Sequence, residues 1–125
     1  MSKMQMFTLA ATLMGLGLSG QAHAAGDAVK GKIVFARCAI CHDVKPGVNK
    51  LGPSLAGIVG RKSGTVKGFA YSGPMKMANK QWTPQNLDAF VTAPFKYIPG
   101  SRMAFGGIPN PTDRANLIAY LQTVK

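Results

Sequence analysis

The sequence lacks glutamate altogether and has only four aspartates, against fifteen lysines and arginines. A surface with this imbalance favours acidic partners and makes association depend on ionic strength. Nucleic acid is one acidic partner to consider, but the chain has no basic stripe interleaved with stacking aromatic residues, no recognised binding motif and no basic tail. We therefore expect no nucleic-acid binding, and we expect some of the lysines to serve only solubility.

Hydrophobic runs long enough to cross a bilayer are also missing. The apolar run from Phe7 to Leu18 is well short of the roughly 20 residues that a membrane-spanning helix needs. Lys3 precedes this run and Ala22-His23-Ala24 follows it, an order typical of a secretory signal peptide with an A-x-A cleavage site. The sequence thus predicts a signal peptide over residues 1–24, export to the periplasm and no stable membrane insertion. An uncleaved membrane anchor is the alternative.

The remaining residues, 25–125, are expected to form one domain, because a chain of this length has too small a core for two. Eight prolines and fifteen glycines, together with the absence of any strand-like hydrophobic run, indicate a loop-rich chain that wraps around a ligand. Without residues 1–24 the chain keeps fourteen lysines and arginines against four aspartates, a net charge of +10.

Three helices are expected in this domain. Asp27 and Thr83 are good N-cap residues, and Pro84 fits the first turn of a helix. The third helix would be capped by Thr112 or Asp113. The expected helical ranges are about 27–37, 83–92 and 112–124. The expected loops are 45–68, with a short helical turn near 55–59, then 71–80, and the inward-packed stretch 97–108.

Cysteine is scarce, and both cysteines lie in the one motif Cys38-Ala39-Ile40-Cys41-His42. C-x-x-C-H is the attachment signature of a c-type haem. Two thiols three residues apart can add to the two vinyl groups on one edge of a haem, and positions i, i+3 and i+4 of a helical turn share a face. The motif therefore predicts one covalent haem c, with His42 as the proximal ligand of its iron.

A disulfide or half of a zinc site would use the same residues. Zinc would need further ligands, but there is no second cysteine pair, and the only other histidine, His23, lies in the expected signal peptide. A thioredoxin-like dithiol would need a preceding strand and a βαβ setting, which the surrounding residues do not indicate. Haem attachment is the interpretation that the motif favours.

A haem that carries electrons, rather than binding small molecules, needs a second axial ligand, and Met103 is the best candidate. A thioether is a soft ligand that favours reduced iron and raises the reduction potential. Methionines in loops more often fill gaps in a core, which is our interpretation of Met75 and Met77. Met103 differs in its setting, the segment Pro99-Gly100-Ser101-Arg102-Met103-Ala104-Phe105.

This segment is one of several short motifs spread over residues 26–125. They are Gly26-Asp27, Lys30-Gly31, Phe35, Cys38 to His42, Gly52-Pro53-Ser54-Leu55, Gly60-Arg61-Lys62-Ser63-Gly64, Gly68-Phe69-Ala70-Tyr71-Ser72, Trp82, Tyr97-Ile98-Pro99-Gly100, Met103, Gly107-Ile108 and Leu117-Ile118-Ala119-Tyr120-Leu121. Together they resemble the class I c-type cytochromes of the mitochondrial-like, bacterial soluble (cytochrome c2) type. The resemblance implies an all-α fold in which the N- and C-terminal helices cross and loops wrap around the covalent haem.

The resemblance also implies roles for further residues. The carbonyl of Pro53 would accept a hydrogen bond from the far ring nitrogen of His42 and orient the imidazole. Gly31 and Phe35 would pack against the C-terminal helix at Leu117 and Tyr120. A buried haem propionate would be held by Arg61, Tyr71 and Trp82, and Ser101 would place a small hydroxyl near the methionine loop. For Tyr71 and Trp82, ordinary aromatic core is the alternative.

Three residues depart from the family's pattern. Phe90 stands where many members have a tyrosine that donates to the ligand sulfur, so that bond should be absent. Phe95 replaces a common docking lysine, and Met75 stands where mitochondrial members often have asparagine. These departures concern the partner fit and the reduction potential rather than haem binding.

The expected function is that of a monomeric single-electron carrier, not an enzyme. Its partners would be acidic docking sites on larger redox complexes, with a quinol–cytochrome c oxidoreductase-type donor and a terminal oxidase or reductase-type acceptor. The cations expected around the exposed haem edge are Arg37, Lys45, Lys50, Lys96 and Arg102. The alternatives are a peroxidase-like haem enzyme that opens its sixth iron position to substrate, and a membrane-tethered cytochrome c.

Overall fold

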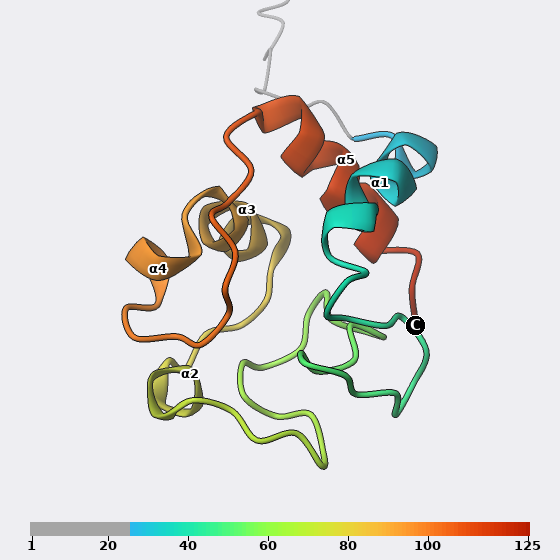
Figure 1. Cartoon of the computed structure of the whole chain (residues 1–125). Helices are drawn as coiled ribbons and strands as arrows, with labels where there is room; N and C mark the ends of the chain where they lie inside the picture. Colours follow the sequence, from blue (N-terminus) through green and yellow to red (C-terminus); the bar gives the residue numbers. More distant parts are fainter. Residues whose placement is uncertain (1–25) are drawn as a thin grey trace, which may run out of the picture.

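The computed structural model describes residues 26–125, so the expected signal peptide and its cleavage site lie outside the described residues. Over this range the chain forms a short 3₁₀ helix and five α-helices (Figure 1). They are α1 (Ala28–Val34), η1 (Phe35–Arg37), α2 (Gly73–Met77), α3 (Pro84–Thr92), α4 (Pro94–Tyr97) and α5 (Pro111–Leu121). Among residues 26–125 β-pairing is limited to an isolated bridge between Lys62 and Gln81. The all-α prediction is confirmed, and no helix in this range is long and apolar enough to cross a membrane.

The N-terminal helix begins as the sequence predicts. The side chain of Asp27 accepts hydrogen bonds from the N–H groups of Val29 (2.8 Å) and Lys30 (3.1 Å), which are two of the unpaired donors of the first turn. The last turn tightens into η1 before the haem motif. Phe35 is buried, whereas Val29 and Ile33 point to solvent, so the apolar residues of this helix do not all face the core.

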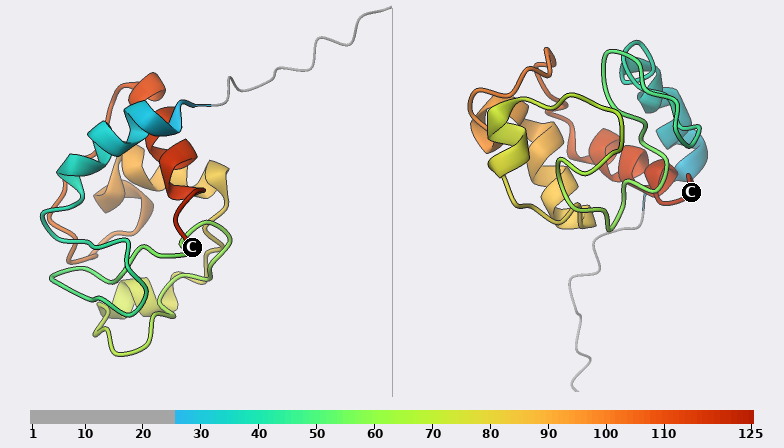
Figure 2. Two further views of the ribbon diagram at one scale, coloured as in Figure 1. Left: turned by 90° about the vertical axis from the view of Figure 1, so that its right-hand side faces the viewer. Right: turned by 90° about the horizontal axis from the view of Figure 1, so that it is seen from below.

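α1 packs against α5 more extensively than any other pair of described helices does, and the two lie side by side in Figures 1 and 2. Gly31 is the point of closest approach, because a side chain there would overlap the backbone carbonyl of Asn116. The rings of Phe35 and Tyr120 are 5.3 Å apart between centroids. The expected crossing of the terminal helices is confirmed, and it supplies the reason for a glycine inside α1.

The cap of the C-terminal helix was predicted wrongly. Asn110, not Thr112 or Asp113, is the N-cap, and its side chain accepts from the N–H groups of both of those residues. Asparagine is among the strongest capping residues, and Pro111 next to it fits the first helical position. The helix also ends at Leu121, three residues earlier than expected.

One prediction for the loops was also wrong. The stretch 71–80 contains α2, whose N-cap Ser72 accepts from the N–H of Met75 at 3.2 Å. Near 55–59 the chain makes a single turn, with the N–H of Ile58 bonded to the carbonyl of Leu55 at 3.1 Å. Pro94 ends α3 as expected but also begins α4. Most of 45–68 is loop, as predicted.

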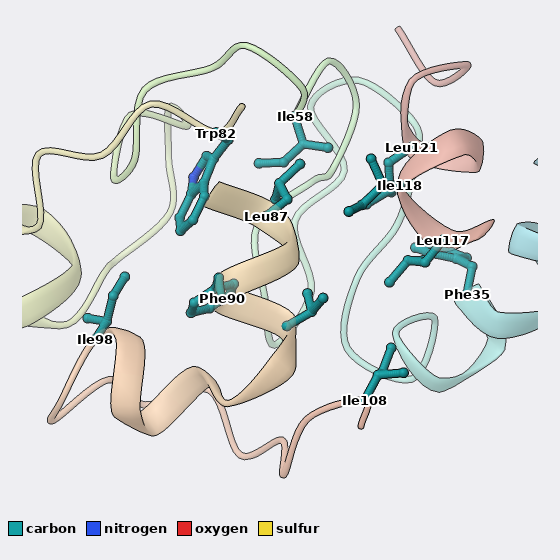
Figure 3. Close-up of a cluster of buried hydrophobic side chains, with 11 residues drawn as sticks. Phe35, Ile58, Trp82, Leu87, Phe90, Ile98, Ile108, Leu117, Ile118 and Leu121 are labelled. Carbon is teal, nitrogen blue, oxygen red and sulfur yellow. The ribbon is translucent and has the colours of Figure 1, made fainter. Parts of the chain in front are cut away.

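The buried hydrophobic side chains form one cluster that extends to both sides of α3 (Figure 3). Trp82, Phe90 and Ile98 lie on one side, and the ring centroids of Trp82 and Phe90 are 5.0 Å apart. The side chains of α1, η1 and α5 that lie on the other side include Phe35, Leu117 and Leu121. Residues on both sides contribute to the wall of a large internal cavity.

Candidate functional site

The chain encloses a cavity of about 880 Å³. Its volume falls within the roughly 300–1,000 Å³ of pockets that enclose one cofactor-sized ligand. The nine residues that the sequence predicts for the site come from six separate segments of the chain, and all nine line this cavity. They are Cys38, Cys41, His42, Pro53, Arg61, Tyr71, Trp82, Ser101 and Met103. The fold therefore brings the whole predicted set together.

The C-x-x-C-H motif forms a helical turn that continues from η1. The N–H groups of Cys41 and His42 both donate to the carbonyl of Cys38, at 3.0 and 2.9 Å. This geometry places the three side chains at positions i, i+3 and i+4 on one wall of the cavity. Neither cysteine is in a disulfide. Burial raises the pKa of the Cys38 thiol to about 11, the opposite of the lowered pKa that a redox-active dithiol needs.

His42 is fixed by two neighbours on the next loop. Its Nδ1 lies 2.7 Å from the carbonyl oxygen of Pro53, and because a carbonyl only accepts, Nδ1 carries the proton. That leaves Nε2 as the atom with a free lone pair. Gly52 packs flat on the ring, where any side chain would overlap the imidazole. Burial lowers the pKa of His42 despite the opposing effect of the bond to Pro53, and Arg61 and Lys50 add to the lowering; the result favours the neutral form that binds metals.

Met103 lies in the long segment between α4 and α5, which is on the opposite side of the molecule in Figure 1 from the segment that follows α1. The Met103 side chain is half-buried and lines the cavity. The hydroxyl of the buried Ser101 accepts a hydrogen bond from the N–H of Met103 at 3.3 Å, and the Met103 carbonyl accepts from the N–H of Phe105 at 2.9 Å. Ser101 therefore shapes the turn that carries the methionine.

Arg61, Tyr71 and Trp82 supply polar groups to another part of the wall. The Arg61 guanidinium donates to the carbonyls of Ser54 and Ala56, both at 3.1 Å, and burial lowers its pKa. The Tyr71 hydroxyl accepts from the N–H of Val66 at 3.0 Å, which leaves its own proton free to donate. A guanidinium, a phenol and an indole in the lining of one cavity suit a carboxylate ligand.

The predicted ring of five cations is only partly present. Arg37, Lys50 and Arg102 line the cavity, whereas Lys45 and Lys96, the latter on α4, are not among its lining residues. Arg102 donates to the carbonyl of Ala70 at 2.8 Å.

The sequence interpretation missed two apolar residues that line the same cavity as these cations. Ile40 and Leu51 line the cavity and yet are 76% and 82% exposed. Large exposed aliphatic side chains beside a ligand motif are the signal that would have identified them. The role of Gly52 was also missed, although the Gly52-Pro53 pair was visible as a turn.

These residues fit a covalent haem. The thiols and the imidazole lie on one wall, a thioether lies in the same cavity, and the remaining lining is largely apolar. Within residues 26–125 there is no group of three His, Cys, Asp or Glu side chains that could hold a metal ion directly. An iron porphyrin needs only axial ligands from the protein, because the ring supplies the other four. Fold and site thus define a protein that encloses a haem attached through C-x-x-C-H.

Comparisons with known proteins agree with this. The family model for cytochrome c matches residues 28–125. The chain is 48% identical to cytochrome c of Euglena viridis over 101 residues, which is 80% of this chain and 99% of that protein. It is 45% identical to cytochrome c2 of Rhodoblastus acidophilus over 102 residues, 81% of this chain and 95% of that protein. The solved structure of cytochrome cH from Methylobacterium extorquens matches with a TM-score of 0.74 and 38% identity, covering 78% of this chain and 99% of the other.

The chain therefore belongs to the cytochrome c family, as a class I c-type cytochrome. It is an electron carrier that uses one covalent haem c with its iron. The predictions of the family, the fold and the cofactor are confirmed.

Proposed function

We propose that this protein is a periplasmic single-electron carrier, not an enzyme, in which His42 and Met103 are the two axial ligands of the haem iron. The observation that carries the proposal is that both side chains line one cavity from distant segments of the chain, with Nδ1 of His42 already bonded to Pro53. The haem, when bound, supplies the one-electron couple of its iron. The surrounding chain supplies ligands, orientation and exclusion of water.

Particular residues supply the attachment, the orientation and the exclusion of water. Cys38 and Cys41 hold the thioether bonds, and Pro53 and Gly52 keep the His42 imidazole in one orientation. A ligand pair held rigidly in both oxidation states leaves little to rearrange when an electron moves. The apolar wall, which includes the buried Phe90, keeps water away from the iron and offers no hydroxyl to the sulfur at that position.

Arg61, Tyr71 and Trp82 are proposed to hold a haem propionate. All three residues line the cavity, and the Arg61 guanidinium is itself fixed by two backbone carbonyls. A charge-assisted bond from guanidinium to carboxylate is roughly twice as strong as a neutral one. Ser101 contributes through the methionine turn rather than through the propionate.

The docking surface is proposed to be the mouth of the cavity beside the two cysteines. Arg37, Lys50 and Arg102 give it positive charge, and Ile40 and Leu51 give it an apolar centre. Acidic sites on larger redox complexes fit this surface: a quinol–cytochrome c oxidoreductase-type donor and a terminal oxidase or reductase-type acceptor. The carrier would act as a monomer, which leaves the surface free for each partner in turn.

Localisation in the periplasm depends on cleavage of residues 1–24, and N-terminal sequencing of the exported protein tests it. A mature terminus at Ala25 supports the proposal, whereas an intact Met1 in a membrane fraction supports the tethered alternative. The ligand pair is tested by the absorption spectrum of the oxidised protein, which should show the charge-transfer band of sulfur bonded to ferric iron. Absence of that band, with avid carbon monoxide binding to the native reduced protein, would support the peroxidase-like alternative instead.

A further inference from the structure

The segment that follows the methionine loop is fixed to the end of α3. Ile108 is fully buried, and its N–H donates to the carbonyl of Val91 at 2.7 Å. Gly107 has a φ of +104°, and a side chain there would overlap the carbonyl of Thr92. This contact brings the chain back to the core only four residues after Met103.

One side chain of α5 fastens this segment from the other side. The Nε of Arg114 donates to Oδ1 of Asp88 on α3 at 2.7 Å. Its Nη1 donates to the carbonyls of Ile108 (3.0 Å) and Pro109 (2.8 Å). The Arg114 side chain is 13% exposed and that of Asp88 is 45% exposed, so the guanidinium is shielded from water more than its carboxylate partner is. Arg114 thus joins α3, α5 and the end of the methionine loop.

Within residues 26–125, Arg114 and Asp88 form the one ion pair. The other described cations face solvent, bond to carbonyls or lie over an aromatic ring, as Lys80 does on Tyr97 at 5.1 Å. Because the chain has only four aspartates for its fifteen lysines and arginines, most of these cations have no carboxylate to pair with. It also lies outside the cavity, so haem contact does not account for it.

The loop between the two fixed ends is held most firmly before Met103. At the start, Ile98 is buried and its N–H is bonded to the carbonyl of Pro94 at 2.9 Å. Ser101 is buried, and Arg102 donates to the carbonyl of Ala70 at 2.8 Å. After Met103, Phe105 packs against the core, but Ala104 and Gly106 are exposed. On this side the position of Met103 therefore depends on Phe105 and on how firmly the Ile108 end is held.

We propose that Arg114 is a positioning residue for Met103: by tying Ile108 and Pro109 to Asp88, it keeps the methionine loop closed over the haem iron. The proposal rests on Met103 ligation, which is part of the proposed function. It assigns Arg114 no contact with the haem or with a redox partner. Its effect is on how often the loop opens and lets the sulfur leave the iron.

The test uses the oxidised holoprotein and imidazole as a competing ligand. At saturating imidazole the rate of ligand exchange is limited by departure of the Met103 sulfur, which is followed as loss of the charge-transfer band. Arg114→Ala removes three hydrogen bonds from a charged group and should speed this step by about tenfold or more. Arg114→Lys retains the charge but not the planar fork, so its rate should lie between those of Arg114→Ala and the wild type.

Asn116→Ala is the matched control on the same helix. Its side chain is buried and accepts from the N–H of Asp27 at 2.8 Å, at the α1–α5 crossing and away from the methionine loop. This variant should lower the denaturation midpoint but leave the imidazole rate at the wild-type value. A role of Arg114 in overall stability alone would instead accelerate exchange in both variants in proportion to their loss of stability.

Two further results separate the outcomes. If Arg114→Ala does not fold, Asp88→Asn removes the ion pair while leaving the two carbonyl bonds, and it should still speed exchange, though less than the loss of all three bonds. Wild-type exchange rates in Asp88→Asn and Arg114→Lys would overturn the assignment. A wild-type protein without the charge-transfer band would contradict Met103 ligation itself, and so the proposed function. A normal band with unchanged rates contradicts only the role of Arg114.

Discussion

Replacing Gly31 with alanine should destabilise the protein, although alanine is the better helix former. In α1 the new methyl group would overlap the carbonyl of Asn116 and lie 2.8 Å from Cβ of Tyr120. An ordinary carbon–oxygen contact is about 3.3–3.6 Å, so α1 and α5 would have to move apart at their crossing. The atoms in the way are the backbone of Asn116 and Cβ of Tyr120, and neither can move aside by a side-chain rotation.

The size of the effect follows from two opposing terms. Overpacking of a core commonly costs about 1–3 kcal/mol, and the rigid contact at Gly31 puts the cost at the upper end. Higher helix propensity returns about 1 kcal/mol. The net loss should be about 2 kcal/mol, which for a domain of this size lowers Tm by roughly 10 °C.

The assay is thermal and guanidinium unfolding of the haem-loaded protein, followed by circular dichroism. Gly73→Ala is the matched control, because Gly73 also lies in a short helix, has an ordinary φ and has no atom within 4 Å of the added methyl group. The control should be as stable as the wild type or slightly more so. A Gly31→Ala protein with wild-type stability would refute the crossing geometry.

Three other changes test the surface and the capping. Lys50→Glu, at the cavity, should slow reduction by an acidic redox partner and weaken the salt dependence of the rate. Lys62→Glu, away from the cavity, should change the rate and its salt dependence less. Equal effects of the two variants would contradict a localised docking surface. Leu51→Ser should slow the same reaction without changing its salt dependence, and an unaltered rate would exclude an apolar contact there. Asn110→Ala should cost about 1 kcal/mol of unfolding free energy because two N–H groups of α5 lose their acceptor; a loss in Thr112→Ala as large as that in Asn110→Ala would contradict this assignment of the cap.

Local chemistry explains what the sequence predicted correctly. The Cys38 to His42 motif carries its own geometry in its spacing, and the caps at Asp27 and Thr83 act within three residues. Such features depend little on the rest of the chain. The other six predicted site residues, which line the same cavity, were proposed for a different reason: the resemblance to a family supplied the long-range arrangement that spacing alone does not contain.

The errors arise where several local solutions compete or where tertiary contacts decide. Asn110, Thr112 and Asp113 can each cap a helix, and the neighbouring proline decides in favour of Asn110. α2 is only five residues long, too short for a periodic pattern to be visible. The position of Lys96 relative to the cavity depends on the turn between α3 and α4, and the Asp88 to Arg114 bond joins residues 26 apart. Neither can be read from a local window.

The most direct test of the ligand assignment is a proton NMR spectrum of the reduced holoprotein. A methionine bound to haem iron lies directly over the porphyrin, so the ring current should shift its methyl resonance far upfield of every ordinary methyl signal. The account predicts one such methyl resonance, which is lost in Met103→Ala and retained in Met75→Leu. A spectrum without an upfield methyl resonance, or one in which the resonance survives Met103→Ala, would contradict axial ligation by His42 and Met103.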